Sequence, residues 1–272
     1  MVHIVKANGE KEEFSEEKVV ASIARAGIPE NMQQEVLAHV LSQVHEDIST
    51  KDIYKHIVEF LGKKEDLYHK AKYSLKQAIM DLGPTGYPFE DYLSTLLTAE
   101  GFTTTVRNVL LGNCISHEID VIATKEEDKL MVEAKFHNST GVKTDVHVAL
   151  YTYARFEDVA KKHGFTKPLL ITNTKITLDV ITYAQCVGMD VISWDYPEGN
   201  SLREIVDTYG LFPITALSRL PNTYKQELLK QGHVLCKDIV ENPMLINQLS
   251  LSEEDKQHIL TEAKALSQKA SS

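Results

Sequence analysis

The sequence predicts a multi-domain α/β protein with an N-terminal β-hairpin and four helices, a central α/β/α unit with a mixed sheet, and a small C-terminal helical unit. Three observations lead to this fold class. An Asn8-Gly9 pair, typical of a tight turn, separates two strand-like runs. A strand–helix–strand pattern over residues 168–194 indicates that part of the central sheet is parallel. Residues 201–266 show only short helical patterns.

The N-terminal part begins with the hairpin and continues as helices. Ser15 is a favourable N-cap for a helix that reaches about Ala26, since Gly27 follows. Apolar residues at helical spacing predict further helices over 31–45, after Thr50, and over 65–81. The GPTGYP stretch at 83–88 and the Pro197–Gly199 region mark two boundaries. The predicted domains are therefore residues 1–83, 84–200 and 201–272.

The central part alternates between helical and extended patterns. An amphipathic helix over 89–100 ends at Gly101. Strand-like pieces follow, and the segment 143–163 is predicted to be helical. A strand, a helix and a second strand complete the part, with Gly188 ending that helix. The expected strands are 103–111, 117–124, 130–137, 168–173 and 189–194.

Composition excludes several classes of protein. No apolar run approaches the roughly 18 residues of a membrane span, and the start has no signal-peptide core. Three cysteines without a CxxC pair indicate neither a zinc cage nor a disulfide framework, so a reduced cytoplasmic location is expected. The net charge of −10 argues against coating nucleic acid by bulk charge. Residues 84–200 hold 10 basic and 16 acidic residues, so DNA contact there needs a local basic patch or a bound cation.

The stretch LMVEAKFH, residues 130–137, places opposite charges in the middle of an apolar strand. Its even-numbered residues share one apolar face, while Glu133, Lys135 and His137 share the other. In an isolated strand of this kind, the charged face is most simply explained as a surface exposed to solvent. Asp120, on the preceding strand, joins Glu133 and Lys135 on one face if the connecting loop has an even number of residues; an odd number puts it on the other face.

If the loop has an even number of residues, Asp120, Glu133 and Lys135 form a patch that can bind a metal ion. Two close carboxylates repel each other unless a cation lies between them, and hard oxygen ligands suit Mg²⁺ or Mn²⁺. Such an ion polarises a phosphodiester and lowers the pKa of a bound water. A neighbouring lysine orients that water or stabilises developing negative charge.

These residues resemble a known family. Asp120 followed by Glu133-Ala134-Lys135 across a hairpin looks like the PD-(D/E)xK nuclease signature. The helix GYPFEDYLSTLLTAEGF resembles the opening helix of Mrr-like restriction endonucleases and archaeal Holliday-junction resolvases. The resemblance covers about residues 86–195, and Ile119 stands where the signature has proline. It implies that Glu90 is a further acidic residue near the metal.

The resemblance implies a metal-dependent endonuclease that hydrolyses DNA. Asp120 and Glu133 are expected to hold Mg²⁺ or Mn²⁺, Glu90 to support the ion, and Lys135 to activate the nucleophile. A homodimer is expected, because cutting both strands needs two sites. Two alternatives remain open: a Holliday-junction resolvase, and a nucleotide-responsive regulator that binds nucleic acid without cutting. Candidates for further contact with substrate, against roles in packing or at the surface, are His117, His137, Tyr151, Tyr153 and Arg155.

The N-terminal part resembles the ATP-cone, a regulatory domain that binds ATP or dATP. The stretch IVKANGEKEEFSEEK follows the family pattern, but Ala7 and Asn8 stand where arginine and aspartate are usual. By this resemblance Lys6 and Lys18 meet phosphates. On spacing alone, both lysines read as solvated. The remaining nucleotide-site residues carried over from the family are Val5, Glu12, Ser15, Thr50 and Tyr54.

The C-terminal part is a small helical unit. Ser252 with two following glutamates predicts the start of its last helix. Gly232 lies in a turn between two predicted helices, loosely like a helix-hairpin-helix that contacts DNA through its backbone. The second glycine of that hairpin is absent, so packing or dimerisation is the favoured role.

Overall fold

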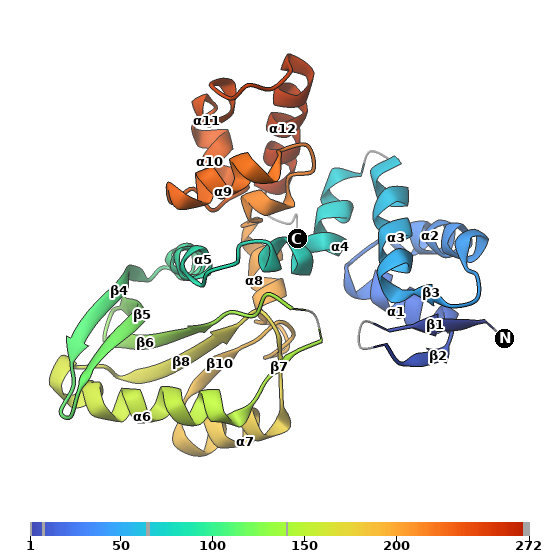
Figure 1. The fold of residues 1–272 in the computed structure, drawn as a ribbon. Coiled ribbons are helices and arrows are strands. Elements are labelled where there is room, and N and C mark those ends of the chain that lie inside the picture. Colours follow the sequence, from blue (N-terminus) through green and yellow to red (C-terminus); the bar gives the residue numbers. More distant parts are fainter. Residues whose placement is uncertain (1, 7–8, 64–65, 140, 269–272) are drawn as a thin grey trace. The chain divides into compact units, whose positions relative to one another are not determined.

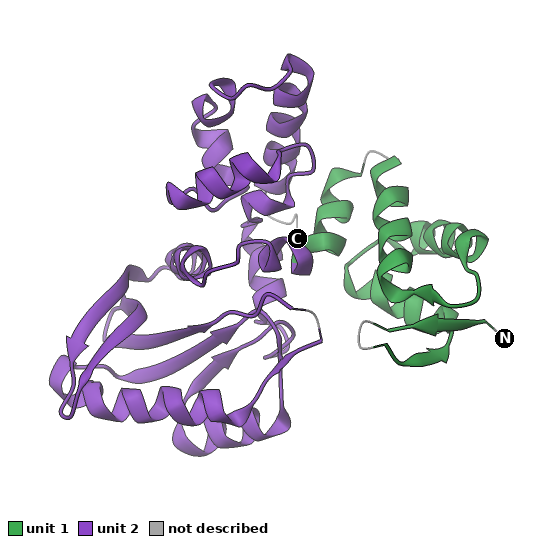
Figure 2. Ribbon diagram, in the orientation of Figure 1, with its two compact units in different colours: residues 1–75 green, residues 76–272 purple. Residues whose placement is uncertain are grey.

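The computed structural model describes residues 2–6, 9–63, 66–139 and 141–268. The chain divides into two compact units, Met1–Leu75 and Lys76–Ser272 (Figure 2). The first unit combines a small sheet with helices, and the second combines a larger mixed sheet with helices (Figure 1). The predicted multi-domain α/β fold class is confirmed.

The first unit contains a three-stranded sheet of order β2-β1-β3. Strand β1 (His3–Val5) pairs antiparallel with β2 (Lys11–Glu13) and parallel with β3 (Ile48–Ser49). Gly9 N donates to the Lys6 carbonyl at 2.9 Å, and Gly9 has a φ of +84°. Residues 6–10 connect β1 to β2 and include the predicted Asn8-Gly9 pair, of which Asn8 lies outside the described residues. Strand β3 was not predicted, because two residues show no period.

Four helices complete this part, as predicted. The Ser15 hydroxyl accepts a hydrogen bond from Lys18 N at 3.2 Å, which caps α1. Ile23, Ile57 and Leu61 are almost fully buried, and each buried side chain of this size contributes about 1.5–3 kcal/mol. The apolar periodicity therefore reports the core correctly. The helices are α1 (Glu16–Arg25), α2 (Glu30–Gln43), α3 (Thr50–Lys63) and α4 (Leu67–Met80).

The second unit is built on a five-stranded sheet of order β10-β8-β6-β5-β4. Strands β4, β5 and β6 are antiparallel neighbours, while β6, β8 and β10 are parallel. The sheet is therefore mixed, as predicted. Its strands are β4 (Thr103–Leu111), β5 (Ser116–Lys125), β6 (Asp128–Lys135), β8 (Lys167–Thr172) and β10 (Asp190–Ile192).

Helices cover both faces of this sheet (Figure 1). Helix α5 (Tyr87–Ala99) contacts β4, β5 and β6, and its Phe89 ring lies 5.3 Å from that of Phe136. Helix α6 (Val146–His163) packs against β6 and β8, and α7 (Leu178–Val187) packs against β10 and α6. Two short strands, β7 (Lys143–Thr144) and β9 (Lys175–Ile176), pair beside the sheet.

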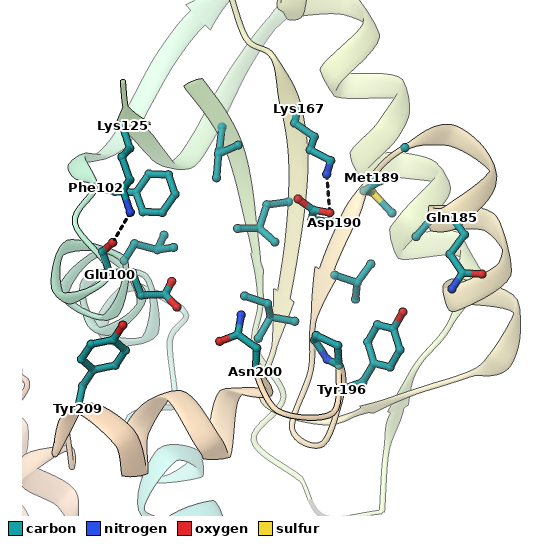
Figure 3. A pocket seen from close by; sticks show the side chains of 18 residues that line it. Glu100, Phe102, Lys125, Lys167, Gln185, Met189, Asp190, Tyr196, Asn200 and Tyr209 are labelled. Carbon is teal, nitrogen blue, oxygen red and sulfur yellow. Dashed lines mark hydrogen bonds and ion pairs between the residues drawn. The ribbon is translucent and has the colours of Figure 1, made fainter. Parts of the chain in front are cut away.

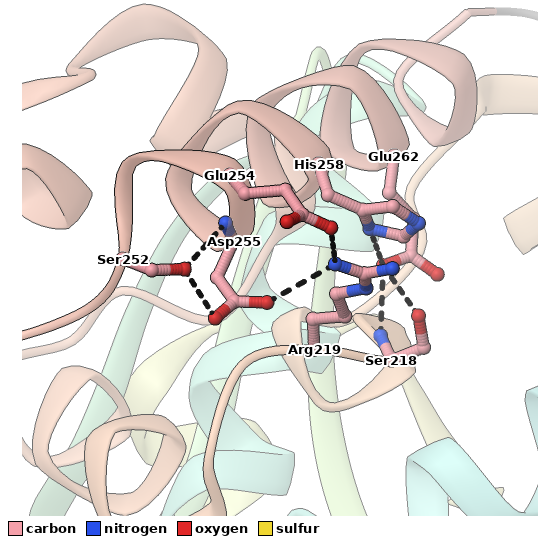
Figure 4. A network of polar contacts seen from close by, with 7 residues as sticks. All are labelled: Ser218, Arg219, Ser252, Glu254, Asp255, His258 and Glu262. Carbon is pink, nitrogen blue, oxygen red and sulfur yellow. Dashed lines mark hydrogen bonds and ion pairs between the residues drawn. The ribbon is translucent and has the colours of Figure 1, made fainter.

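The C-terminal segment is helical. Arg219 contacts Glu254 and Asp255 at 2.9 and 3.2 Å, and buried Glu262 accepts from the Ser218 backbone N at 2.8 Å (Figure 4). These contacts attach the loop before α9 to the last helix. The elements are α8 (Leu202–Tyr209), a 3-10 turn (Ile214–Ala216), α9 (Asn222–Lys230), α10 (Cys236–Glu241), α11 (Met244–Asn247) and α12 (Glu253–Leu266), which Ser252 caps as predicted.

Among the described residues, no helix has both the length and the apolar character needed to cross a bilayer.

Candidate active site

A two-residue loop joins β5 to β6, as the even-loop prediction requires. Lys125 pairs with Asp128, which leaves Glu126 and Glu127 as the loop, and Glu126 has a φ of +54°. The paired register runs to Val121 opposite Val132. One further step along both strands brings Asp120 opposite Glu133. The Asp120 Oδ2 accepts a hydrogen bond from Ala134 N at 2.7 Å, so its carboxylate lies against the strand that carries Glu133 and Lys135.

Glu133 is held by a buried arginine of α6. Arg155 forms an ion pair with Glu133 through Nη1 and donates Nη2 to the Glu118 carbonyl, so it ties β5 to β6. Its side chain is 8% exposed. Arg155 lies on the buried face of α6, where Ala149, Thr152 and Val159 are its companions. An arginine at helical spacing with small and apolar residues was the sequence signal for this buried structural role. The predicted contact of Arg155 with a phosphate does not fit its burial.

Burial and mutual repulsion shift the carboxyl groups. Burial first, and the Asp120 charge second, raise the pKa of Glu133 to about 7, against the opposing effects of Arg155 and Lys135. Burial also raises the pKa of Asp120, while the Ala134 N–H and Arg155 oppose the rise. Removing charged oxygens from water disfavours ionisation, and a second carboxylate nearby disfavours it further. The pair is therefore electrostatically ready to accept a cation.

Glu90 reaches the same patch from the first turn of α5. Burial and then the Asp120 charge raise its pKa to about 7, which places Glu90 within electrostatic reach of Asp120. Its Oε2 contacts Arg107 Nη1 at 3.3 Å, and the other guanidinium nitrogen contacts Asp91 at 2.7 Å. Arg107 was not among the predicted site residues. The sequence signal for Arg107 was that it is the single charged residue in a strand of threonines, an asparagine and apolar residues.

Lys135 ends β6 at the carboxyl edge of the parallel strands, opposite Thr172 of β8. Among the described residues it takes part in no ion pair, so its ammonium is available to a ligand. Buried Asn173 accepts from the His137 N–H at 2.9 Å and donates to the His137 carbonyl at 2.7 Å. This double contact fixes the backbone just beyond Lys135. Burial, and then Lys135, lower the pKa of His137, whose ring contacts Thr144.

The donor set fits Mg²⁺ or Mn²⁺ as a partly hydrated ion. Asp120 and Glu133 offer carboxylate oxygens on adjacent strands, and burial raises the pKa of both groups. In the described part of the chain, no three His, Cys, Asp or Glu side chains are grouped to hold one metal, so Glu90 does not complete a ready-made cage. Mg²⁺ commonly binds through one or two carboxylates plus waters and substrate phosphates. Two carboxylates therefore suffice, and the metal assignment stays a prediction.

The other candidates on this unit have structural partners. His117 contacts Asp158 of α6 at 2.8 Å, and Asp158 also accepts from the backbone N of Cys114 and Ile115. These bonds, led by His117, hold the pKa of Asp158 far below its usual range. They attach the β4–β5 hairpin to α6. The Tyr153 ring lies 6.1 Å from that of Phe156, whereas Tyr151 is 60% exposed.

In the first unit, the structure brings four of the predicted nucleotide-site residues together. The Glu12 carboxylate lies 2.9 Å from Lys6 Nζ and 3.0 Å from Lys18 Nζ. Ser15 caps the helix that carries Lys18. The hydrogen bond to Glu12 raises the pKa of Lys6, and the two lysines lower the pKa of Glu12. Two ammonium groups beside a helix N-terminus are suited to a polyphosphate.

The other three predicted residues lie on neighbouring elements. Val5 pairs with Ser49 across the parallel β1–β3 ladder, which brings β1 beside Thr50, the first residue of α3. The Tyr54 ring stacks on Tyr73 of α4 with centroids 5.4 Å apart. Their contact with a nucleotide stays a prediction.

A cavity of about 760 Å³ lies elsewhere on the second unit (Figure 3). Its wall includes Lys125, Lys167 and Asp190, but none of the predicted nuclease residues. Lys167 pairs with Asp190 at 2.7 Å, and Lys125 donates to the Glu100 carbonyl at 2.8 Å. These three charged groups already have partners, so the carboxylate patch, and not this cavity, is the candidate active site.

Comparison with known proteins gives a consistent result. Residues 2–77 match the ATP cone domain family, residues 84–198 match a restriction endonuclease family (Mrr_cat), and residues 212–267 match the AF1548-like, C-terminal family. An uncharacterized protein of Archaeoglobus fulgidus is 39% identical over 173 residues, which cover 63% of this chain and 98% of that protein. A crystal structure of a protein of unknown function, AF1548, aligns with a TM-score of 0.58 and 38% identity over 66% of this chain and 97% of that one.

Proposed function

Because the chain belongs to the same family as the Archaeoglobus fulgidus protein, and carries an ATP cone domain ahead of a restriction endonuclease domain, we propose that it is a metal-dependent endonuclease acting on DNA. The observation that carries the proposal is the β5–β6 register, which sets Asp120 beside Glu133 with Lys135 two residues further along β6. A purely binding protein has no use for buried, mutually repelling carboxylates. The domain limits 1–83, 84–200 and 201–272 are part of this proposal.

The reaction is the hydrolysis of a phosphodiester bond by water. Asp120 and Glu133 hold Mg²⁺ or Mn²⁺, which supplies charge to polarise the phosphate and to lower the pKa of a bound water. Arg155 keeps Glu133 in place by fixing one of its oxygens. Lys135, at the open end of β6, orients the attacking water or stabilises the charge that develops on the phosphate. Glu90 supports the ion or its water ligands from α5.

The N-terminal domain binds ATP or dATP through Lys6 and Lys18. Release of Glu12 from both lysines, and of Glu10 from Lys6, frees two cations for the phosphates, and Ser15 and Thr50 belong to the same site. Nucleotide occupancy regulates cleavage by the second unit. A homodimer and a cytoplasmic location belong to the same proposal. A Holliday-junction resolvase remains the alternative within the enzyme class.

A cleavage assay on supercoiled plasmid and on a four-way junction tests the active site. Asp120→Asn and Lys135→Ala should each reduce the rate at least about 10²-fold with Mg²⁺ present, as expected when a group that stabilises transition-state charge is lost. Lys125→Ala, at the end of β5 in the same hairpin, is the matched control and should cut at the wild-type rate. Wild-type rates in both site variants would contradict the assignment, and faster cutting of the junction than of the plasmid would favour the resolvase.

Calorimetry with Mn²⁺ separates the enzyme from a non-cleaving regulator. The wild-type protein should bind Mn²⁺, and Asp120→Asn should bind it at least about tenfold more weakly, since one of two carboxylate ligands becomes neutral. Binding that does not depend on Asp120 would favour the regulator.

A further inference from the structure

Arg107 has an unusual backbone at the centre of β4. It lies between the pairs Val106–Val121 and Asn108–Ile119, so it faces Asp120 across the ladder. Its φ is +54°, a left-handed conformation that residues other than glycine, asparagine and aspartate rarely adopt. Such conformations concentrate at functional sites, where the surrounding structure enforces them. The positive φ therefore occurs at the residue of β4 that lies opposite Asp120, the proposed metal ligand.

The Arg107 side chain is oriented toward the carboxylates. Nη2 contacts Asp91 at 2.7 Å, while Nη1 makes a longer contact of 3.3 Å with Glu90. The guanidinium carbon lies 5.7 Å from the centre of the Tyr87 ring. Asp91 and Tyr87 together hold the planar guanidinium group of Arg107 in one orientation. The weaker contact to Glu90 is the one that another anion can replace.

Accessibility distinguishes Arg107 from Arg155. The Arg155 side chain is 8% exposed and is committed to Glu133 and the Glu118 carbonyl, whereas the Arg107 side chain is 33% exposed. A guanidinium offers two parallel N–H donors that match two oxygens of a phosphate. Arg107 therefore combines a phosphate-binding group, solvent access and a fixed orientation beside the acidic patch, whose own charge otherwise repels a nucleic-acid strand.

We propose that Arg107 is a substrate-binding residue that holds a phosphate of the bound nucleic-acid strand at the Asp120–Glu133 site, in exchange for its contact with Glu90. This inference rests on the proposed nuclease function. The competing explanation is that Arg107 only braces the first turn of α5 against β4.

The test is the salt dependence of DNA binding, measured by fluorescence anisotropy with a short duplex and with Ca²⁺ in place of Mg²⁺ to prevent cleavage. Each phosphate contact contributes about 0.9 to the slope of log K against log salt concentration. Arg107→Gln and Arg107→Gly should each reduce the slope by about that amount and weaken binding roughly tenfold at low salt. A residue that only braces the fold does not change this slope.

Two controls match the change in charge and in backbone. Arg219 also bridges two carboxylates, Glu254 and Asp255, in the first turn of a helix, so Arg219→Gln removes an equivalent arginine from the C-terminal segment. Glu126 also has a φ of +54°, so Glu126→Gly reports the effect of glycine at such a position. Neither should reduce the slope. Arg107→Gly should keep the fold, because glycine adopts positive φ without strain.

The outcomes separate this inference from the function on which it rests. Wild-type protein that binds and cuts DNA, with unchanged slopes in both Arg107 variants, overturns the inference alone. Wild-type protein that neither binds nor cuts overturns the proposed function and the inference with it. A slope reduced in both Arg107 variants but not in Arg219→Gln supports the inference.

Discussion

The two charged clusters of this protein use similar residues in opposite environments. In the first unit, Glu12 lies between Lys6 and Lys18, and the two lysine side chains are 38% and 65% exposed. In the second unit, Glu133 pairs with Arg155 next to Asp120, and both members of the ion pair are largely buried. Lys6 also lies 3.8 Å from Glu10, so the exposed cluster balances two lysines with two carboxylates, whereas the buried cluster sets two carboxylates beside one guanidinium.

The difference teaches how burial determines what a charged cluster can do. In water, the partners of Glu12 lower its pKa, so all three groups stay charged and can exchange partners at little cost. In the buried cluster, the cost of desolvation outweighs the attraction of Arg155, and the pKa of Glu133 rises. The first arrangement suits a regulatory anion that comes and goes. The second suits a cation held in place for chemistry.

The largest effect is expected from Arg155→Met. Removal of one partner of a buried ion pair leaves an uncompensated charge, which costs about 3–5 kcal/mol. We expect a loss of this size in the free energy of unfolding of the second unit, measured by denaturant titration without metal. The double variant Glu133→Gln/Arg155→Met should recover part of the loss, because the stranded charge is gone. A loss under about 1 kcal/mol in the single variant would place this pair with ordinary surface ion pairs.

The next effect is a dependence of stability on pH. Glu90 and Glu133 have pKa values near 7 when folded and about 4.3 when unfolded. The folded state therefore binds protons more readily between these values, and the metal-free protein should gain stability as the pH falls from 8 to 5. Thermal unfolding across this range measures it. His137, whose pKa is lowered by burial, opposes part of this gain below about pH 6.5, whereas Asp158, whose pKa is also lowered, does so only below about pH 4.

Glu133→Gln is the control for the pH experiment. Its amide does not titrate, so the gain in stability between pH 8 and 5 should shrink. Saturating Mg²⁺ should also flatten the wild-type curve, because a bound cation favours the ionised carboxylates. A wild-type stability that rises steadily with pH through 7 would show that these carboxyl groups are not shifted upward.

The smallest effect on folding is expected in the exposed cluster. Lys6→Ala and Lys18→Ala should leave thermal unfolding unchanged, because exposed ion pairs contribute little. Each should weaken ATP binding about tenfold, through the loss of a charge-assisted hydrogen bond to a phosphate. Lys11→Ala is the matched control, since Lys11 lies on β2 of the same hairpin and pairs with Asp47. Equal ATP affinities in all three variants would show that Lys6 and Lys18 do not bind the nucleotide.

The sequence alone was sufficient for the longer elements and for the shared face of Glu133 and Lys135 on β6. Helical periodicity located α1 to α7 to within a few residues, because each helix buries one continuous apolar stripe. Period-two alternation set Glu133 and Lys135 on one face, but the sequence left the loop length open, and only the two-residue loop of the structure adds Asp120 to that face. The helices and the face that Glu133 and Lys135 share depend on neighbours in the chain, so a local pattern contains them. The two-residue strands β3, β7 and β9 are too short to show one.

Only the tertiary structure decided which groups surround the carboxylates. Arg155 and Arg107 reach them from a helix and a strand 22 and 17 residues away from Glu133 and Glu90 in the sequence. No spacing rule connects such positions, because side-chain direction depends on how the helices pack on the sheet. The raised pKa values of Glu90 and Glu133 have the same origin. They come from burial and from charges brought together by folding, whereas the sequence determines only that ionisable groups are present.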